Sequence, residues 1–251
     1  MIKVIISGCN GKMGQVVESI CAADPQVQVV AGFDVSQANR SYPVYVSPAN
    51  FSGEADAVID FSSPKALDGL LQFCTERKIP VVLATTGYSQ EQLDQIEEAS
   101  KLVPIFRSGN MSYGMNVVLE LVKKAAQLLG DQYDIEIVEQ HHKRKVDAPS
   151  GTALMLADAA KEGLDYEPEY VYGRADRRMA RPKNEIGISS VRGGTIVGVH
   201  NVIFAGHDEV IEINHTALSR EIFATGAVKA AKFLAGVSAP GMYSMQQVVA
   251  E

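Results

Sequence analysis

The sequence is poor in cysteine and has no long apolar run, and both absences restrict where the protein can work. Its three cysteines, Cys9, Cys21 and Cys74, are odd in number and show neither a C-x-x-C pair nor a paired metal-ligand spacing. This usage favours a reducing compartment. The N-terminal apolar run Val4–Ile6 ends before Gly8, too early for a signal peptide or a membrane span. We therefore expect a cytoplasmic protein without a membrane partner.

An excess of positive charge is also lacking. The chain of 251 residues carries 30 acidic and 23 basic side chains, giving a formal net charge of −7 at pH 7. Nucleic-acid binding draws on many lysines and arginines, so this composition argues against nucleic acid as a partner. With 46% hydrophobic and 21% charged residues, the chain has the composition of a globular protein. Its length allows one large domain or two modest ones.

The most informative stretch runs from Glu136 to Ala153, with the sequence EIVEQHHKRKVDAPSGTA. Alternating apolar residues at its start predict a half-buried strand, which delivers two histidines and a Lys-Arg-Lys cluster into a turn. The segment 149–152 then opens a helix, so backbone N–H groups and hydroxyls converge just beyond the cations. Such a site suits an anion, and histidine can exchange protons there near neutral pH. The alternative interpretations are a solvated basic surface and a structural histidine.

A second candidate site follows the first predicted strand. Residues 2–6 and 27–33 read as buried strands, and the apolar residues between them recur on one helical face. Three glycines with a spacing of three residues follow the first strand: Gly8, Gly11 and Gly14. They permit close backbone approach to a pyrophosphate, although Asn10 replaces the second glycine of the dinucleotide-binding pattern. Asp34 follows the second strand, where a carboxylate can bind an adenosine ribose. A plain strand-to-helix turn is the structural alternative.

The rest of the first half alternates strands and helices, which is typical of a doubly wound parallel sheet. Ligands of such sheets bind beyond the carboxyl ends of the strands. The segments expected to line one crevice are Phe61-Ser62, Ala84-Thr85-Thr86-Gly87 and Ser108-Gly109-Asn110-Met111. The carboxylate of Asp34 would repel a 2′-phosphate and so favours NADH, whereas Lys12 and Arg40 could offset it and admit NADPH.

The second half predicts a separate, mostly antiparallel sheet. Its strand-like runs are Ile186–Arg192, Thr195–Val199, Asn201–Phe204 and Val210–Asn214. Gly193-Gly194 predicts a hairpin between the first two runs. The arginine-rich connection from Asp165 to Asn184 is interpreted as a solvated or mobile flap. Three further histidines are interpreted as structural or surface residues: His200, His207 and His215. From Ser219 the pattern is helical again, and we expect the last thirty residues to return to the first domain.

Together these segments resemble the dihydrodipicolinate reductase family, also called 4-hydroxy-tetrahydrodipicolinate reductases, over essentially the whole chain. The most specific element is the family pattern E-[IV]-x-E-x-H-x-x-x-K-x-D-x-P-S-G-T-A, which residues 136–153 match at every fixed position. Other segments that look like the family are Gly8–Gly14, Ala84–Gly87, Arg192-Gly193-Gly194 and Ser219-Arg220. Arg144 and Val35 occupy positions where some relatives carry other residues, which leaves the nucleotide preference open.

The resemblance implies a Rossmann-type α/β domain at 1–112 and 222–251, and an α+β domain at 113–221 that binds substrate and builds a homotetramer with its open sheet. It implies that NADH or NADPH reduces a small dianionic cyclic imine to tetrahydrodipicolinate, in the diaminopimelate route to lysine. His141 would donate or accept a proton, and Lys145 would be a second proton donor.

The resemblance also implies which residues bind the ligands, and it implies no metal. Substrate binding would fall to His142, Ser150, Gly151 and Thr152. Cofactor binding would fall to Gly8, Cys9, Asn10, Gly11, Lys12, Met13, Asp34, Ala84, Thr85, Thr86, Ser108, Gly109, Asn110 and Met111. Two other classes of function stay open: another two-domain dehydrogenase, acting on an amino or keto acid, and a nucleotide-sensing module without turnover.

Overall fold

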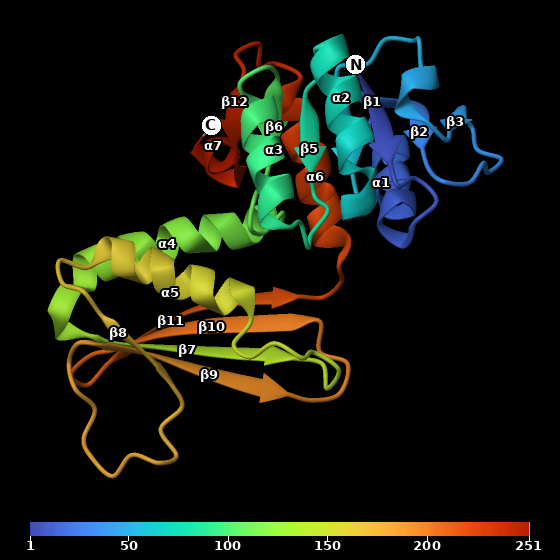
Figure 1. Cartoon of the computed structure of the whole chain (residues 1–251). Coiled ribbons are helices and arrows are strands. Elements are labelled where there is room, and N and C mark those ends of the chain that lie inside the picture. The colour runs from blue at the N-terminus through green and yellow to red at the C-terminus, as the bar shows by residue number, and fades with distance from the viewer. Residues whose placement is uncertain (251) are drawn as a thin grey trace. The chain divides into compact units, whose positions relative to one another are not determined.

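The computed structural model describes residues 1–250, which form two compact units (Figure 1). Unit 1 consists of Met1–Tyr113 and the C-terminal segment from Glu221, and unit 2 consists of Gly114–Arg220. Each expected domain boundary lies one residue from this division. Within residues 1–250, none of the helices combines the length and the hydrophobicity that crossing a bilayer requires.

Unit 1 is built on a parallel sheet with the strand order β12-β6-β5-β4-β1-β2-β3. Every neighbouring pair in this order is parallel, so the expected doubly wound sheet is confirmed. The strands are β1 (Ile2–Ser7), β2 (Val27–Phe33), β3 (Val44–Tyr45), β4 (Ala57–Asp60), β5 (Val81–Leu83), β6 (Pro104–Phe106) and β12 (Gly241–Tyr243). The order reverses at β1 and β4, whose carboxyl ends therefore flank a topological switch point.

Helices cover both faces of this sheet because its strands are apolar on both sides. Along β1, Val4 and Ile6 belong to one buried cluster, with α1 and α6, whereas Ile5 belongs to the other, with α2 and α3. The helices are α1 (Lys12–Ala23), α2 (Leu67–Arg77), α3 (Gln90–Ser100), α6 (Glu221–Leu234) and α7 (Met245–Ala250), with the 3-10 turns η1 (Pro48–Asn50) and η2 (Pro64–Ala66). Unit 1 therefore has one hydrophobic core on each face of its sheet.

The C-terminal segment completes unit 1. Strand β12 pairs in parallel with β6 at the edge of the sheet, so the predicted return to the first domain is found. Helix α6 comes so close to the segment after β6 that a Cβ added at Gly226 would lie 1.6 Å from the carbonyl oxygen of Met111. This approach requires a residue without a side chain, and it fixes the end of the 108–111 loop.

Unit 2 is a five-stranded mixed sheet with the order β11-β10-β7-β9-β8. Two of its pairings are antiparallel and two are parallel. Helices α4 and α5 lie over one face of the sheet (Figure 1) and share its buried cluster. The elements are α4 (Tyr113–Leu129), η3 (Gly130–Gln132), β7 (Asp134–His141), α5 (Gly151–Gly163), β8 (Glu169–Tyr172), β9 (Glu185–Arg192), β10 (Gly198–Ala205) and β11 (Val210–Ala217).

The predicted hairpin at Gly193-Gly194 is wrong. Strands β9 and β10 are consecutive in the chain, but β7 lies between them and pairs with both. The two expected runs Thr195–Val199 and Asn201–Phe204 are replaced by the single strand β10. The first half of central β7 buries Ile135 and Ile137 on its inner face, so placing this strand between two partners outweighs the local turn preference.

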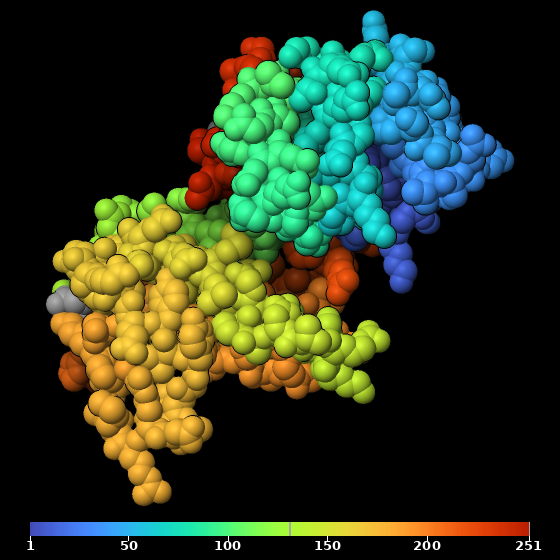
Figure 2. Space-filling model, in the orientation of Figure 1, coloured from blue at the N-terminus to red at the C-terminus, as the bar shows by residue number. Residues whose placement is uncertain are grey.

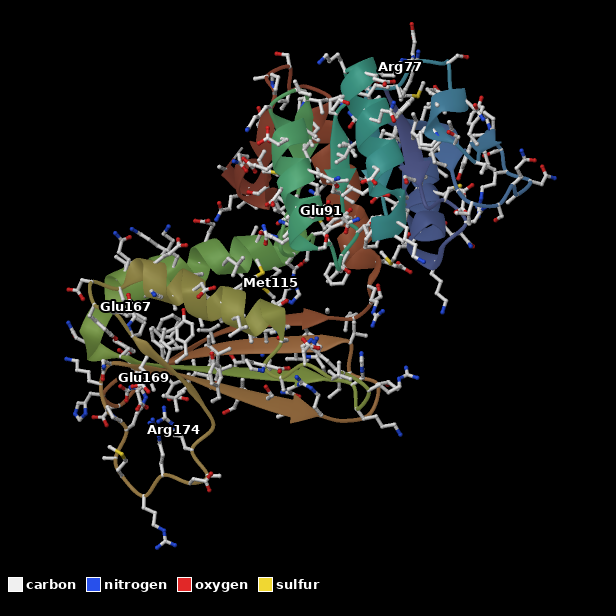
Figure 3. The ribbon with its side chains drawn as sticks, in the orientation of Figure 1. Arg77, Glu91, Met115, Glu167, Glu169 and Arg174 are labelled. Carbon is white, nitrogen blue, oxygen red and sulfur yellow. The ribbon has the colours of Figure 1, made fainter. Side chains whose placement is uncertain are left out.

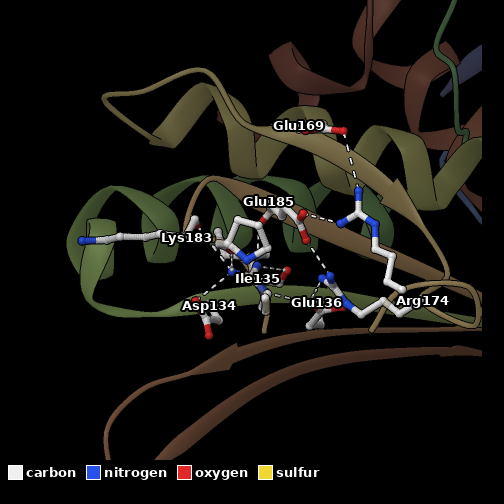
Figure 4. Close-up of polar contacts among 10 residues, drawn as sticks. Asp134, Ile135, Glu136, Glu169, Arg174, Lys183 and Glu185 are labelled. Atoms are coloured by element: carbon white, nitrogen blue, oxygen red, sulfur yellow. Dashed lines mark hydrogen bonds and ion pairs between the residues drawn. The ribbon is translucent and has the colours of Figure 1, made fainter. Parts of the chain in front are cut away.

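The interpretation of the 165–184 connection as a solvated or mobile flap is wrong for its ordered parts next to the sheet, although residues 175–180 are exposed. It contains the edge strand β8, and its arginines bind carboxylates of the sheet (Figures 3 and 4). Arg174 bonds Glu136 at 2.7 Å and Glu185 at 2.5 Å. Arg181 bonds the same Glu136 at 2.9 Å, and Arg177 contacts Glu185. Only the tip of the connection projects from the unit (Figure 2).

We predict that Gly226→Ala destabilises the protein by roughly 1–3 kcal/mol, because the added methyl group collides with the backbone of the 108–111 loop. Urea unfolding measures the change. Gly69→Ala is the matched control, since Gly69 is exposed on α2 and no atom lies within 4 Å of the added Cβ, and it should stabilise by roughly 0.5–1 kcal/mol. Similar unfolding midpoints for Gly226→Ala and Gly69→Ala would contradict the close approach of α6 to the 108–111 loop.

Candidate functional site

The turn after β1 is shaped by two glycines of the predicted nucleotide site. Gly8 has a φ of 77°, and a Cβ there would lie 2.7 Å from the carbonyl oxygen of Phe61. A Cβ at Gly14 would lie 2.2 Å from the carbonyl oxygen of Gly8. The chain can therefore fold this tightly at the switch point only because both residues lack side chains. The cradle that results has the form that a pyrophosphate needs.

Asn10 and Asp34 join the glycine turn to the end of β2. The Asn10 backbone N–H donates to Oδ2 of Asp34 at 2.9 Å, and its side-chain amide donates to the Ser36 carbonyl at 2.8 Å. Asn10 thus connects two loops at the position where the dinucleotide-binding pattern has a glycine. Arg40 donates to the amide oxygen of Asn10 at 3.0 Å and pairs with Glu18, which places a cation beside the predicted ribose carboxylate.

Helix α1 begins in this turn with its first N–H groups available to an anion. Its N-cap residue, Gly11, has no side chain that could cap them. Lys12 is exposed, Met13 is half-buried and Cys9 is fully buried. Together with the glycine cradle, this arrangement fits a dinucleotide, with its pyrophosphate at the start of α1 and its ribose at Asp34.

A buried carboxylate that the sequence reasoning did not single out ties together the other predicted cofactor loops. Asp60 at the end of β4 is 1% exposed. It accepts hydrogen bonds from Thr85 Oγ1 at 2.6 Å and Ser62 Oγ at 2.5 Å, so it joins the loops after β4 and β5. In the loop after β6, Ser108 Oγ donates to the Asn110 carbonyl at 3.0 Å. Thr86 is exposed and Ala84 is half-buried.

In unit 2 the predicted proton-transfer residue stands at the end of the central strand. Residues of β7 alternate between the buried inner face and the outer face, so Glu139 and His141 both point inward beneath α5. Nδ1 of His141 lies 2.6 Å from Oε2 of Glu139. The histidine side chain is 11% exposed and the glutamate is fully buried.

Glu139 is ionised despite its burial. Burial alone would raise the pKa of Glu139, but hydrogen bonds from Arg192, Ser190 and His141 outweigh it and lower the pKa from 4.5 to about 2. The Arg192 guanidinium binds both carboxylate oxygens, each at 2.7 Å, in the fork geometry that suits a carboxylate. The register of β7 and β9 places Arg192 beside His141, so the pair forms at the end of both strands.

Ser150 and His200 support the start of α5. Ser150 Oγ accepts from the Ala153 N–H at 3.1 Å, as an N-cap should. The same oxygen lies 3.0 Å from Nε2 of His200. Burial, then the neighbouring His141, lowers the pKa of His200 to about 4, so this ring is neutral near pH 7. Ser150 is only 2% exposed, and its hydroxyl holds the helix start rather than facing solvent.

The other predicted substrate residues lie on the loop between β7 and α5, which stands out from the surface of the unit (Figure 2). Nζ of Lys145 lies 2.8 Å from Oδ2 of Asp147. His142 is half-buried, Gly151 is exposed, and Thr152 is half-buried on the first turn of α5. The cations, the histidines and the helix start thus converge on one end of the sheet.

The structure brings the predicted residues together as two sets. Every predicted cofactor residue belongs to unit 1, and every predicted catalytic or substrate residue belongs to unit 2. Sequence reasoning missed the role of Glu139, although it is part of the matched pattern, and the role of Arg192. It also assigned His200 to a structural or surface class, whereas the ring packs 5.1 Å from His141. The alternation of β10 could have shown that His200 faces inward.

Comparisons with known proteins agree with this arrangement. The family model described as dihydrodipicolinate reductase, N-terminus, matches residues 2–111, and the model for the C-terminus matches residues 114–249. The 4-hydroxy-tetrahydrodipicolinate reductase of Caldanaerobacter subterraneus subsp. tengcongensis is 56% identical over 99% of this chain and 98% of its own length. The chain belongs to the dihydrodipicolinate reductase family. The resemblance inferred from the sequence is thereby confirmed.

Two further comparisons extend this result. The 4-hydroxy-tetrahydrodipicolinate reductase of Clostridium tetani is 50% identical over 98% of this chain and 96% of its own length. The structure of a dipicolinate-bound dihydrodipicolinate reductase from Paenisporosarcina matches with a TM-score of 0.79 and 23% identity over 97% of each chain. At that identity the structural match supports the fold of the dihydrodipicolinate reductase family, namely a Rossmann-type domain and a second mixed sheet.

The ionised Glu139 predicts an acid-sensitive stability in this dihydrodipicolinate reductase family member. Because folding lowers the Glu139 pKa from 4.5 to about 2, the stabilisation is complete above about pH 5 and is lost as the pH falls toward 2. We expect the wild type to lose about 3 kcal/mol more than Glu139→Gln over this range. Urea unfolding at several pH values measures the difference, with Glu91→Gln at an exposed position of α3 as control. A pH-independent difference between wild type and Glu139→Gln would contradict the ionised pair.

Proposed function

We propose that the chain uses NADH or NADPH to reduce a cyclic imine dicarboxylate to tetrahydrodipicolinate, in the diaminopimelate route to lysine. The observation that carries this proposal is the match of both halves of the dihydrodipicolinate reductase family to one chain. The geometry supports it, because unit 1 has a glycine turn that fits a dinucleotide, and unit 2 has a cationic loop next to His141, whose ring is hydrogen-bonded to Glu139.

The proposed cofactor site lies at the carboxyl ends of β1 and β4 in unit 1, where the strand order reverses. Gly8–Met13 would hold the pyrophosphate through backbone N–H groups and the start of α1, and Asp34 would bind the adenosine ribose. The loops at 84–86 and 108–111 would line the remainder of the crevice. When bound, the reduced nicotinamide supplies a hydride. The protein positions the cofactor, because the loops around it are fixed. The backbone at Gly8 lies against Phe61 and the backbone at Gly226 lies against Met111, and Asp60 accepts hydrogen bonds from the loops after β4 and β5.

The proposed substrate site is the end of the β7 sheet in unit 2. Lys145, His142, Gly151 and Thr152 would bind the two carboxylates, because cations and the start of a helix attract anions. Ser150 would act indirectly, since its hydroxyl caps the helix. His141 would exchange a proton with the ring nitrogen of the imine, and Lys145 would be the second proton donor. Nearby positive charge stabilises the electron density that reaches this nitrogen during reduction.

We further propose that the protein is a cytoplasmic homotetramer that binds neither nucleic acid nor membranes. The support for assembly is the outer face of the mixed sheet, opposite α4 and α5, where half-buried Val138, Val199 and Ile203 alternate with the inward residues. Apolar residues gathered on a sheet face are a common place for subunits to meet. The support for a reducing compartment is that Cys9, Cys21 and Cys74 are all free and buried.

We predict that His141→Gln lowers kcat by roughly a hundredfold, because it removes the group that exchanges the proton. The loss of nicotinamide absorbance is followed with freshly generated substrate and with each nucleotide in turn. Dipicolinate, the molecule bound in the Paenisporosarcina structure, tests whether the variant still binds a ring dicarboxylate, and its affinity should change little. Unchanged turnover in a folded His141→Gln protein would exclude His141 from this role.

We predict that Asp34→Ala weakens NADH binding more than NADPH binding. The carboxylate accepts ribose hydroxyls but repels a 2′-phosphate, and Arg40 remains beside the site to bind that phosphate. Isothermal titration with each nucleotide measures the two affinities. Asp94→Ala at an exposed position of α3 is the control and should leave both affinities unchanged. Equal losses for the two nucleotides would show that Asp34 acts only through its hydrogen bond to the Asn10 backbone.

A further inference from the structure

The inner face of the mixed sheet carries a row of polar residues that crosses its strands. The register places His200 opposite Glu139 on one side and Ser190 opposite Glu139 on the other. Two residues further along β7, His141 stands opposite Arg192. Residues that face each other across strands are within contact distance, so the sheet itself assembles these groups around the carboxylate of Glu139.

All the surroundings of Glu139 donate hydrogen bonds to it. Oε1 accepts from Arg192 Nη2 at 2.7 Å and from the Ser150 N–H at 3.1 Å. Oε2 accepts from Arg192 Nη1 at 2.7 Å and lies 2.6 Å from Nδ1 of His141. An ionised carboxylate has no proton to donate. Nδ1 must therefore carry the proton of the neutral imidazole, and the lone pair of that ring must be on Nε2.

On the Nε2 side, the His141 ring lies next to Gly198. A Cβ added at Gly198 would lie 3.2 Å from Nε2 of His141, closer than such contacts normally come. Strand β10 therefore leaves space beside Nε2 only because residue 198 has no side chain. The face of the ring is supported by His200, whose plane makes an angle of 73° with it. His141 is thus fixed at Nδ1, supported on one face and open at Nε2.

We propose that Glu139 is a positioning residue which, held by Arg192, accepts a hydrogen bond from Nδ1–H of His141 and so fixes the tautomer whose Nε2 faces the substrate, while Gly198 keeps the space beside Nε2 clear. This proposal rests on the proposed role of His141 in proton transfer. It adds that the reacting nitrogen is Nε2. It also adds that Nδ1–H stays bonded to the ionised Glu139 while Nε2 first takes up a proton from solvent and then delivers it to the imine nitrogen.

Glu139→Gln tests the tautomer directly, because the amide keeps only one of the two oxygens that accept hydrogen bonds in the wild type. The amide oxygen should take the Oε1 position, where the Arg192 Nη2 and Ser150 N–H groups both donate. The NH₂ group then takes the Oε2 position and donates to Nδ1 of His141, which moves the ring proton to Nε2. The substitution keeps the size of the side chain, reverses the hydrogen bond with His141 and removes the acceptor of Arg192 Nη1.

The experiment is ¹⁵N NMR of the full protein labelled in histidine at mildly alkaline pH, with the His141 signals identified by their loss in His141→Gln. Ring ¹⁵N shifts distinguish the two neutral tautomers. We expect the Nδ1–H form in the wild type and the Nε2–H form in Glu139→Gln, with kcat lowered by roughly a hundredfold or more and dipicolinate affinity nearly kept. An Nε2–H form in the wild type, or the same tautomer in both proteins, would overturn the proposal.

Gly198→Ala provides a second test that leaves the Glu139–Arg192 ion pair intact. The added methyl group crowds Nε2, so we expect kcat to fall roughly tenfold while the Nδ1–H signal persists. Gly69→Ala, with open space around its Cβ, is the control and should leave kcat unchanged. Full activity of Gly198→Ala would remove Gly198 from the proposal. Full activity of His141→Gln together with the Nδ1–H tautomer in wild type would instead refute the proposed proton transfer by His141.

Discussion

The charge of Glu139 is the constraint on which the architecture of unit 2 depends. A carboxylate with no exposed surface is strongly unfavourable unless its charge is balanced and its oxygens are bonded. The balance comes from Arg192, at the end of a strand 53 residues further along the chain. Only a parallel pairing of β7 and β9 in this register brings the guanidinium to the carboxylate. The ion pair therefore explains why β9 lies beside β7 and does not form a hairpin with β10.

A second set of ion pairs holds the other end of the same two strands. Glu136 near the start of β7 and Glu185 at the start of β9 are both bound by Arg174, and Arg181 reaches Glu136 and Asp134. The arginines bind there because the parallel pairing brings these acidic side chains together, and their repulsion requires cations. The connection before β9 therefore fixes the beginning of the strand pair whose end carries the reactive groups.

The sequence predicts unit 1 better than unit 2 for a physical reason. The glycine turn after β1 and the position of Asp34 after β2 follow from a pattern contained in one strand–helix–strand unit, and both lie where that pattern predicts them. The partners of Glu139 depend instead on which strands pair, and pairing is decided by the whole sheet. The spacing of His200 or Arg192 carries no signal of this kind. The capping of α5 by Ser150 was predictable, but the burial of its hydroxyl against His200 was not.

The two proposed sites should therefore differ in what disturbs them. The nucleotide cradle is made of backbone, and it holds its shape as long as Gly8 and Gly14 remain and the helix after them begins at the same residue. The groups around His141 come from β7, β9, β10 and the start of α5. A slip of one residue in any of these pairings would turn a required side chain to the other face of the sheet. The mixed sheet is thus part of the chemistry, because its register determines which nitrogen of His141 is free to react.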